Sequence, residues 1–198
     1  PSSAASDVYK RQDVDTKISI PFAAPYQMMN MTLAYQAMRM LEPETGIKKE
    51  EILKGIRNTR WQGRMQEVGE NIYFDGAHNV AGIHAFLDSV ALIRPQNPIL
   101  LFSMVSDKDY EKAIQLLAER GQWEQVIVTT ISDKRGIPAE DIARIFSHFG
   151  QQAVVIEDSR KAYEWALKGK KRGQALFCTG SLYFIGELLE ITGGKNSD

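Results

Sequence analysis

The sequence lacks the features that mark secreted, membrane-spanning or strongly charged proteins. It contains one cysteine, Cys178, so neither a disulfide framework nor a cysteine-based zinc site is available. It has no uninterrupted run of about 18 apolar residues, and its N-terminus lacks the apolar core of a signal peptide. The 24 lysines and arginines nearly balance the 25 aspartates and glutamates, so no whole-protein field attracts nucleic acid or an anionic membrane. We therefore expect a cytoplasmic protein that binds neither nucleic acid nor membrane.

Several nucleotide and metal motifs are also missing. There is no G-x-x-x-x-G-K-[ST] phosphate loop, no G-x-G-x-x-G after a strand-like run and no H-E-x-x-H. The missing glycine fingerprint disfavours an NAD-dependent oxidoreductase. His78 and His84 face different sides of one expected helix, so they do not form a metal pair. We expect no metal site among these residues, and if ATP binds, other groups must hold its phosphates.

The composition is otherwise typical of a soluble globular protein, because 43% of the 198 residues are hydrophobic and 25% are charged. Residues 1–17 are polar and have no helical or strand period, so we expect a disordered tail there. Residues 1–12 also resemble a translated adapter sequence, and they are left out of the fold prediction.

Two helices are expected after this tail. Residues 25–41 open with a proline suited to a helix start. Their apolar residues recur at helical spacing and predict one buried face, made of Met29, Leu33, Ala34, Ala37 and Leu41. Residues 48–59 form a second, shorter amphipathic pattern. The two helices have no strand of their own, which indicates the remainder of another unit.

From residue 65 onward, short apolar runs alternate with helical patterns. MQEV and NIYF resemble a hairpin, and four further runs are interpreted as buried strands, namely PILLFSMV, QVIVTT, AVVIED and ALFCTG. The alternation predicts an α/β, Rossmann-like fold, with a mostly parallel sheet, helices on both faces and right-handed crossovers. Ligands of such sheets bind at the carboxyl ends of the strands, which here are followed by DGAHN, SDKD, TTISDKRG, EDSR and TGS.

The junction DGAHN combines an acid, a glycine, an imidazole and an amide where a strand ends and a helix begins. Asp75 falls at the strand end, Gly76 permits an unusual turn, and Asn79 suits the helix N-cap. A helix N-terminus carries unpaired N–H groups and a partial positive charge, so the junction suits a nucleotide. Asp75 would then face ribose hydroxyls, and His78 a phosphate or ring edge. Ordinary turn formation is the alternative, since Asp, Gly and Asn are common turn residues.

Three further positions could hold anionic groups. Ser181 stands where a helix N-cap is expected, and Lys108 follows an apolar run at the ligand edge of the sheet. Arg64 lies just before the sheet region and could reach a phosphate as a fork donor. The alternatives are a simple cap for Ser181, a solvated cap region for Lys108 and an ordinary surface position for Arg64.

Together these motifs resemble the folylpolyglutamate synthase and dihydrofolate synthase group of the Mur ligase family. RWQGRMQEVGENIYFDGAHNVAGIHAFL is similar to the group's W-P-G-R-hydrophobic-E segment followed by D-G-A-H-N, TGSLYF to its T-G-S-L-Y motif, and PYQMMN to its H-Q-x-x-N helix start. Gln62 replaces the family's proline, and Tyr26 its histidine. The likeness implies that residues 18–59 are the last helices of a central ATPase domain and that residues 60–198 are the Mur ligase C-terminal domain.

The resemblance also implies an activity and its residues. Members of the group use ATP and Mg²⁺ to phosphorylate a substrate carboxylate, and the amine of L-glutamate then attacks the acyl phosphate. The acceptor is dihydropteroate or the γ-carboxylate of a folate such as tetrahydrofolate. The residues implied for nucleotide binding are Asn30, Arg64, Asp75, His78 and Asn79. Arg64, at the ATP phosphates, and His78 are the expected catalytic residues. Ser181 first, and then Lys108, are expected to hold glutamate.

The phosphate-binding loop, the Mg²⁺ ligands and most of the folate site would lie upstream of residue 18. We therefore expect the C-terminal part of a monomeric ligase, inactive by itself, with an exposed apolar patch where the central domain docks. Two alternatives stay open, a fragment of a cell-wall Mur ligase and a nucleotide-binding module without catalytic activity. The choice between adding the first glutamate, later ones or both depends on a pterin pocket outside this chain.

Overall fold

The computed structural model describes residues 24–107 and 109–193, so Lys108 and the expected tail lie outside the described residues. The chain divides after Trp61 into two units. The described residues up to 61 are called the helical unit, and those from 62 onward the sheet unit. No helix in this described part of the chain is long and apolar enough to cross a membrane.

The helical unit is a pair of helices, α1 (Pro25–Thr45) and α2 (Lys49–Asn58). Pro25 opens α1 as predicted, because a helix does not use the N–H group that proline lacks at its first position. α1 continues past the expected end at residue 41. The helix ends at its C-cap, Gly46, which adopts the left-handed conformation with φ +69°. The N–H of Gly46 donates to the Glu42 carbonyl at 2.8 Å.

The buried face of α1 differs from the predicted one. Met31 packs with Ile52 and Ile56 of α2, and all three are buried. Met29 and Leu33 of the predicted face are instead 57% and 62% exposed. The prediction was wrong because α1 has apolar residues on more than one side, and the contact with α2 decides which side is buried. An apolar surface is left on the helical unit, formed by Met29, Leu33, Met40 and Leu41.

The sheet unit is built on one sheet, whose described strands have the order β1-β2-β6-β3-β4-β5. β1 (Gln66–Gly69) pairs antiparallel with β2 (Ile72–Asp75), and the other neighbours pair in parallel. The remaining strands are β3 (Ile99–Phe102), β4 (Gln125–Thr130), β5 (Ala153–Asp158) and β6 (Leu176–Thr179). The predicted, mostly parallel sheet with a hairpin at its start is therefore confirmed.

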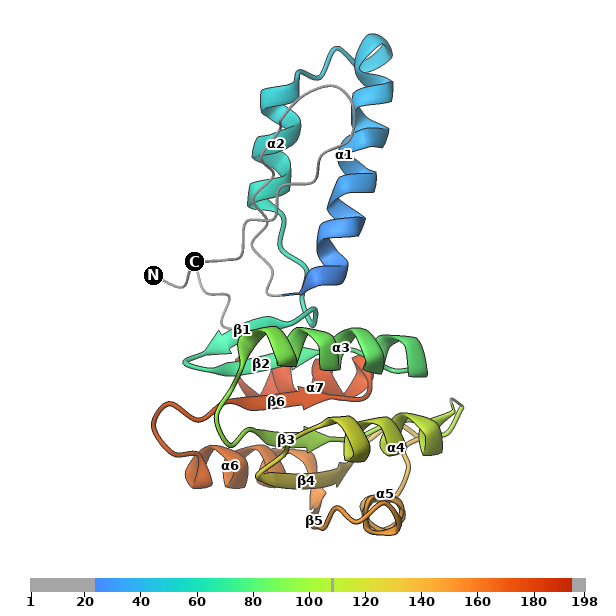
Figure 1. Ribbon diagram of the computed structural model, residues 1–198, viewed down its shortest axis with the longest axis vertical. Helices are drawn as coiled ribbons and strands as arrows, with labels where there is room; N and C mark the ends of the chain where they lie inside the picture. The colour runs from blue at the N-terminus through green and yellow to red at the C-terminus, as the bar shows by residue number, and fades with distance from the viewer. Residues whose placement is uncertain (1–23, 108, 194–198) are drawn as a thin grey trace. The chain divides into compact units, whose positions relative to one another are not determined.

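Helices cover both faces of this sheet, as predicted (Figure 1). On one face lie α6 (Ser159–Gly169) and α7 (Leu182–Ile191), where Tyr163 of α6 meets Phe74 of β2 edge to face at 5.8 Å. On the other face lie α3 (Val80–Ile93), α4 (Tyr110–Arg120) and α5 (Ala139–His148). There Phe86 of α3 meets Phe177 of β6 at 6.0 Å. Apolar residues thus fill both sides of the sheet, as continuous apolar strands require.

Two strands differ from their predictions. β5 was expected to be buried, but it is the edge strand, and its Val155 is 39% exposed. The sequence of an apolar run does not show whether the strand is central or at an edge. Its burial depends on the neighbouring strands and helices that cover it. β3 ends at Phe102, short of the predicted PILLFSMV, since the chain turns there and Val105 forms an isolated bridge with Gly136.

The strand order places three junctions side by side. β6 lies between β2 and β3, although it comes last in the chain. In the parallel register, Asp75 of β2 and Phe102 of β3 both stand beside Thr179 of β6. The segments that follow these residues therefore leave the same edge of the sheet together, which is the edge where open α/β sheets bind ligands.

Candidate functional site

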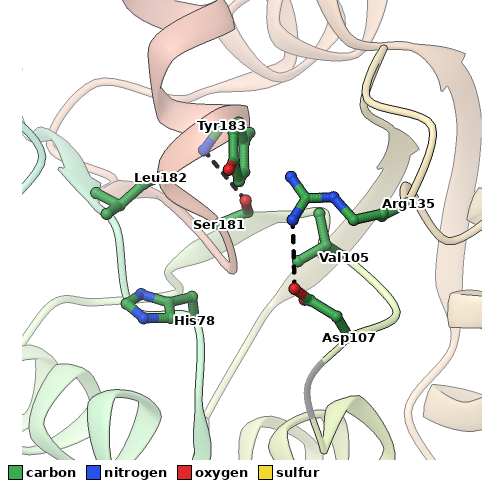
Figure 2. Close-up of a pocket in the computed structure, with 7 residues that line it drawn as sticks. All are labelled: His78, Val105, Asp107, Arg135, Ser181, Leu182 and Tyr183. Carbon is green, nitrogen blue, oxygen red and sulfur yellow. Dashed lines mark hydrogen bonds and ion pairs between the residues drawn. The ribbon is translucent and has the colours of Figure 1, made fainter.

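A pocket of about 230 Å³ lies at this carboxyl edge (Figure 2). It is lined by residues that follow four different strands, namely His78, Val105, Asp107, Arg135, Ser181, Leu182 and Tyr183. The structure thus brings together His78 and Ser181, two of the residues singled out in the sequence. Of the others, Arg64, Asp75 and Asn79 stand elsewhere in the sheet unit, while Lys108 lies outside the described residues.

Ser181 is fixed at the start of α7. Its side chain is 1% exposed, and its Oγ accepts the backbone N–H of Tyr183 at 3.1 Å, so it caps the helix as its position suggested. Gly180 before it has φ +119°, and a Cβ there would overlap the carbonyl oxygen of Ser103 and the ring of Phe102. Only glycine fits this turn, which brings the backbone of Gly180 against the end of β3 just before Ser181.

His78 has a defined ring orientation. Its Nδ1 lies 2.8 Å from the carbonyl oxygen of Gly76. Because a carbonyl only accepts, Nδ1 is the nitrogen that carries the proton. In the neutral ring Nε2 is then an acceptor, suited to a hydroxyl or amine N–H of a ligand. A direct hydrogen bond from Nε2 to a phosphate oxygen requires the protonated ring.

Arg135 is one of two charged residues of the pocket that sequence reasoning missed, the other being Asp107. Its Nε and one terminal nitrogen donate to the two carboxylate oxygens of Asp133 at 2.9 and 3.0 Å, and its other terminal nitrogen to Asp107 at 3.3 Å. The guanidinium also lies 4.7 Å from the ring centroid of Tyr183. Hydrogen bonds from Arg135 lower the pKa of Asp133 to about 2 and raise the pKa of the guanidinium above its ordinary value. Its place in the junction TTISDKRG was the only signal for it.

The loop that carries Arg135 is held by α7. Glu187 accepts the backbone N–H of Ser132 at 2.7 Å through one carboxylate oxygen. Its other oxygen accepts the Ser159 hydroxyl at 3.0 Å, at the start of α6. One carboxylate thus ties the loop after β4 to the two helices on that face, which fixes where Arg135 can lie.

Asp75 is buried and serves the segment that carries Arg64. Its carboxylate is 2% exposed and accepts the backbone N–H groups of Met65 at 2.9 Å and Ala77 at 2.8 Å. Nearby, the N–H of Gly76 donates to the carbonyl of Gly63 at 2.7 Å. Arg64 therefore has an anchored residue on each side. The expected contact of Asp75 with a ribose stays a prediction.

The remaining expected nucleotide residues are not among the residues that line the pocket. Asn79 caps α3 as predicted, because its Oδ1 accepts the N–H of Gly82 at 2.8 Å. Asn30 belongs to the helical unit, where its Nδ2 donates to Gln27 Oε1 at 3.0 Å. Among the described residues, no group of three or more His, Cys, Asp and Glu side chains is placed to hold a metal ion.

Comparisons with known proteins agree with this architecture. The family model "Mur ligase, glutamate ligase domain" matches residues 63–182. The chain is 24% identical over 196 residues to the folylpolyglutamate synthase of Lacticaseibacillus casei, covering 93% of this chain and 44% of that protein. It is 25% identical over 184 residues to a probable dihydrofolate synthetase of Schizosaccharomyces pombe, covering 86% of this chain and 43% of the relative. The chain thus spans less than half the length of these relatives.

A solved structure shows the same fold. It is the folylpolyglutamate synthase of Mycobacterium tuberculosis, complexed with ADP and AMPPCP. The TM-score is 0.75 with 21% sequence identity, over 90% of this chain and 42% of that one.

Proposed function

Because the chain belongs to the Mur ligase family and contains its glutamate ligase domain, we propose that it is the C-terminal part of an ATP-dependent ligase that adds L-glutamate to a folate. The acceptor is the γ-carboxylate of tetrahydrofolate, the carboxylate of dihydropteroate, or both. The likeness to a folylpolyglutamate synthase and a probable dihydrofolate synthetase supports this choice of acceptor. Because the chain spans less than half of these relatives, the activity is proposed for the longer protein, and the chain alone is proposed to be inactive.

The observation that carries the proposal is the pocket at the carboxyl edge of the sheet. Arg135 is a planar fork donor, the kind of group that recognises carboxylates. Ser181 adds a hydroxyl at the N-terminus of α7, where the helix dipole favours an anion. An amino acid with two carboxylates needs such donors. We assign Ser181 and Arg135 to the glutamate, with Lys108 as a further candidate.

The same edge fits a nucleotide beside this pocket. ATP supplies, when bound, the phosphoryl group that activates the acceptor carboxylate as an acyl phosphate, from which the glutamate amine displaces phosphate. Arg64 sits between two anchored residues, so its guanidinium starts from a defined place, and we assign it to the phosphates. Asn79 caps the helix that follows Asp75, and His78 presents Nε2. Asp75 and Asn30 are assigned to the ribose and the adenine.

No residue of this chain is assigned as a ligand of the divalent metal. The reaction needs Mg²⁺ to offset the charge of the transferring phosphoryl group. The described residues offer no cluster of ligands for it. We propose that its ligands belong mainly to the part of the longer protein that this chain does not include.

The test is coupling of radiolabelled glutamate by the longer protein, with ATP and Mg²⁺ and with either dihydropteroate or tetrahydrofolate. His78→Ala should lower kcat at least about tenfold, since it removes a group at the site. His84→Ala is the matched control, because His84 is exposed on α3 and bonds to Arg120 outside the pocket. Use of neither pterin, with ATP-dependent coupling to a nucleotide-sugar peptide instead, would contradict the folate assignment.

A further inference from the structure

The pocket contains charges of both signs. Arg135 and Asp107 both line it, and Figure 2 shows their charged groups pointing toward one another. Asp107 is joined to Arg135 at 3.3 Å, and each side chain is 41% exposed. The two loops are also joined by their backbones, since Ser106 N–H donates to the Arg135 carbonyl at 2.8 Å. The carboxylate of Asp107 is therefore held at the pocket by the geometry of both loops.

The guanidinium of Arg135 also contacts a second acid. Asp133 takes two of its donors in a fork at 2.9 and 3.0 Å, both shorter than the 3.3 Å contact with Asp107. The fork is the stronger arrangement, because two parallel charge-assisted bonds fix the pair. Of the two carboxylates that contact this guanidinium, that of Asp107 lines the pocket. A carboxylate in the wall of the pocket suits a cationic group of a ligand.

We propose that Asp107 accepts the ammonium group of the incoming amino acid and so selects an amine-bearing substrate. An amino acid zwitterion matches a pocket with a carboxylate on one side and the Ser181 hydroxyl and helix N-terminus on the other. The inference rests on the proposed function, in which glutamate supplies the amine. It adds the residue that distinguishes glutamate from a dicarboxylate without an amine.

The opposite role for Asp107 makes an opposite prediction. If its carboxylate only occupied the position of a substrate carboxylate on Arg135, removing its charge would strengthen binding of every dicarboxylate. If it receives the ammonium group, removing its charge weakens the binding of glutamate and spares glutarate, which has the same two carboxylates and no amine. Comparing the two ligands therefore separates the roles.

The experiment titrates the 198-residue chain with L-glutamate and with glutarate, following backbone amide shifts by NMR. The parent should bind glutamate about tenfold more tightly than glutarate, and Asp107→Asn should lose about tenfold in glutamate affinity, the effect of one charge-assisted bond. Glutarate affinity should stay unchanged or rise. Asp109→Asn is the matched control, because this neighbouring acid is 61% exposed, lies 3.9 Å from Lys112 and does not line the pocket.

The outcomes separate this inference from the proposed function. If Asp107→Asn keeps the parent's preference for glutamate, or binds both ligands more tightly, the role assigned to Asp107 is refuted and the ligase proposal stands. If the parent binds neither ligand, the glutamate pocket itself is wrong. A loss of preference in Asp107→Asn alone, with the Asp109→Asn variant like the parent, supports the inference.

Discussion

Replacing Asp75 by alanine should destabilise the sheet unit strongly, because its carboxylate holds two buried backbone groups. The carboxylate accepts hydrogen bonds from the backbone N–H groups of Met65 and Ala77, and each of these residues is only 2% exposed. A hydrogen bond to a charged acceptor contributes about 1.5–3 kcal/mol, and water entering the space left by the side chain recovers part of this. The expected loss in the free energy of unfolding is about 3–5 kcal/mol.

Urea unfolding followed by circular dichroism measures this loss. With a slope of about 2 kcal/mol per molar urea, the midpoint should fall by roughly 1.5–2.5 M. Asp75→Asn should lose about half as much, since the amide keeps one acceptor oxygen. Asp88→Ala is the control, because Asp88 is 61% exposed and its ion pair with Arg120, at 2.8 Å, should contribute no more than about 1 kcal/mol.

The reasoning is refuted if Asp75→Ala unfolds within about 1 kcal/mol of the parent. In that case the hydrogen bonds from the two backbone groups to the carboxylate would not stabilise the fold, and the role of Asp75 would be confined to ligand binding. A stable variant that had lost nucleotide binding would point to the ribose contact. A destabilised variant would place the segment around Arg64 under the control of Asp75.

Two further predictions concern the turn before α7 and the pair beside the pocket. Gly180→Ala should lower the free energy of unfolding by about 3 kcal/mol and Tm by at least about 6 °C, because φ is +119° and the new Cβ overlaps Ser103 and Phe102. Gly186→Ala, inside α7 with open space around it, should raise Tm by about 2 °C, and equal effects in differential scanning calorimetry would contradict this account. Arg135 lowers the pKa of Asp133 from 3.8 to about 2, so the stability it adds is fully present above about pH 4 and is lost as the pH falls toward 2. The difference in urea midpoint between the parent and Asp133→Asn should therefore shrink from pH 5 to pH 2, and a constant difference would show that the pair does not titrate in this range.

The local elements were largely predictable from the sequence. QVIVTT and ALFCTG form β4 and β6, because continuous apolar runs of this length suit strands covered on both faces. Asn79 and Ser181 cap α3 and α7, since a short polar side chain before an apolar helical pattern satisfies the first backbone N–H groups. The failures, the face of α1 and the burial of β5, are both questions of which neighbour covers an apolar surface.

The site was predictable only in part. The carboxyl ends of parallel strands share one edge, so the junctions DGAHN and TGS could be named as ligand positions before their distance was known. The ion pairs of Arg135 with Asp133 and Asp107 gave no such signal. DKR and SDKD are ordinary charged turn sequences, and their meaning depends on two loops that are 28 residues apart and meet in space.

The sequence by itself determined which segments form strands and helices and several of the caps between them, because periodicity, capping residues and glycine turns act over a few residues. Tertiary structure alone decided that β6, last in the chain, enters between β2 and β3, and that the loop after β4 lies against the loop after β3. Strand order depends on contacts between distant segments that no local pattern records. The pocket, with Arg135 and Asp107 side by side in its lining, exists because of that order.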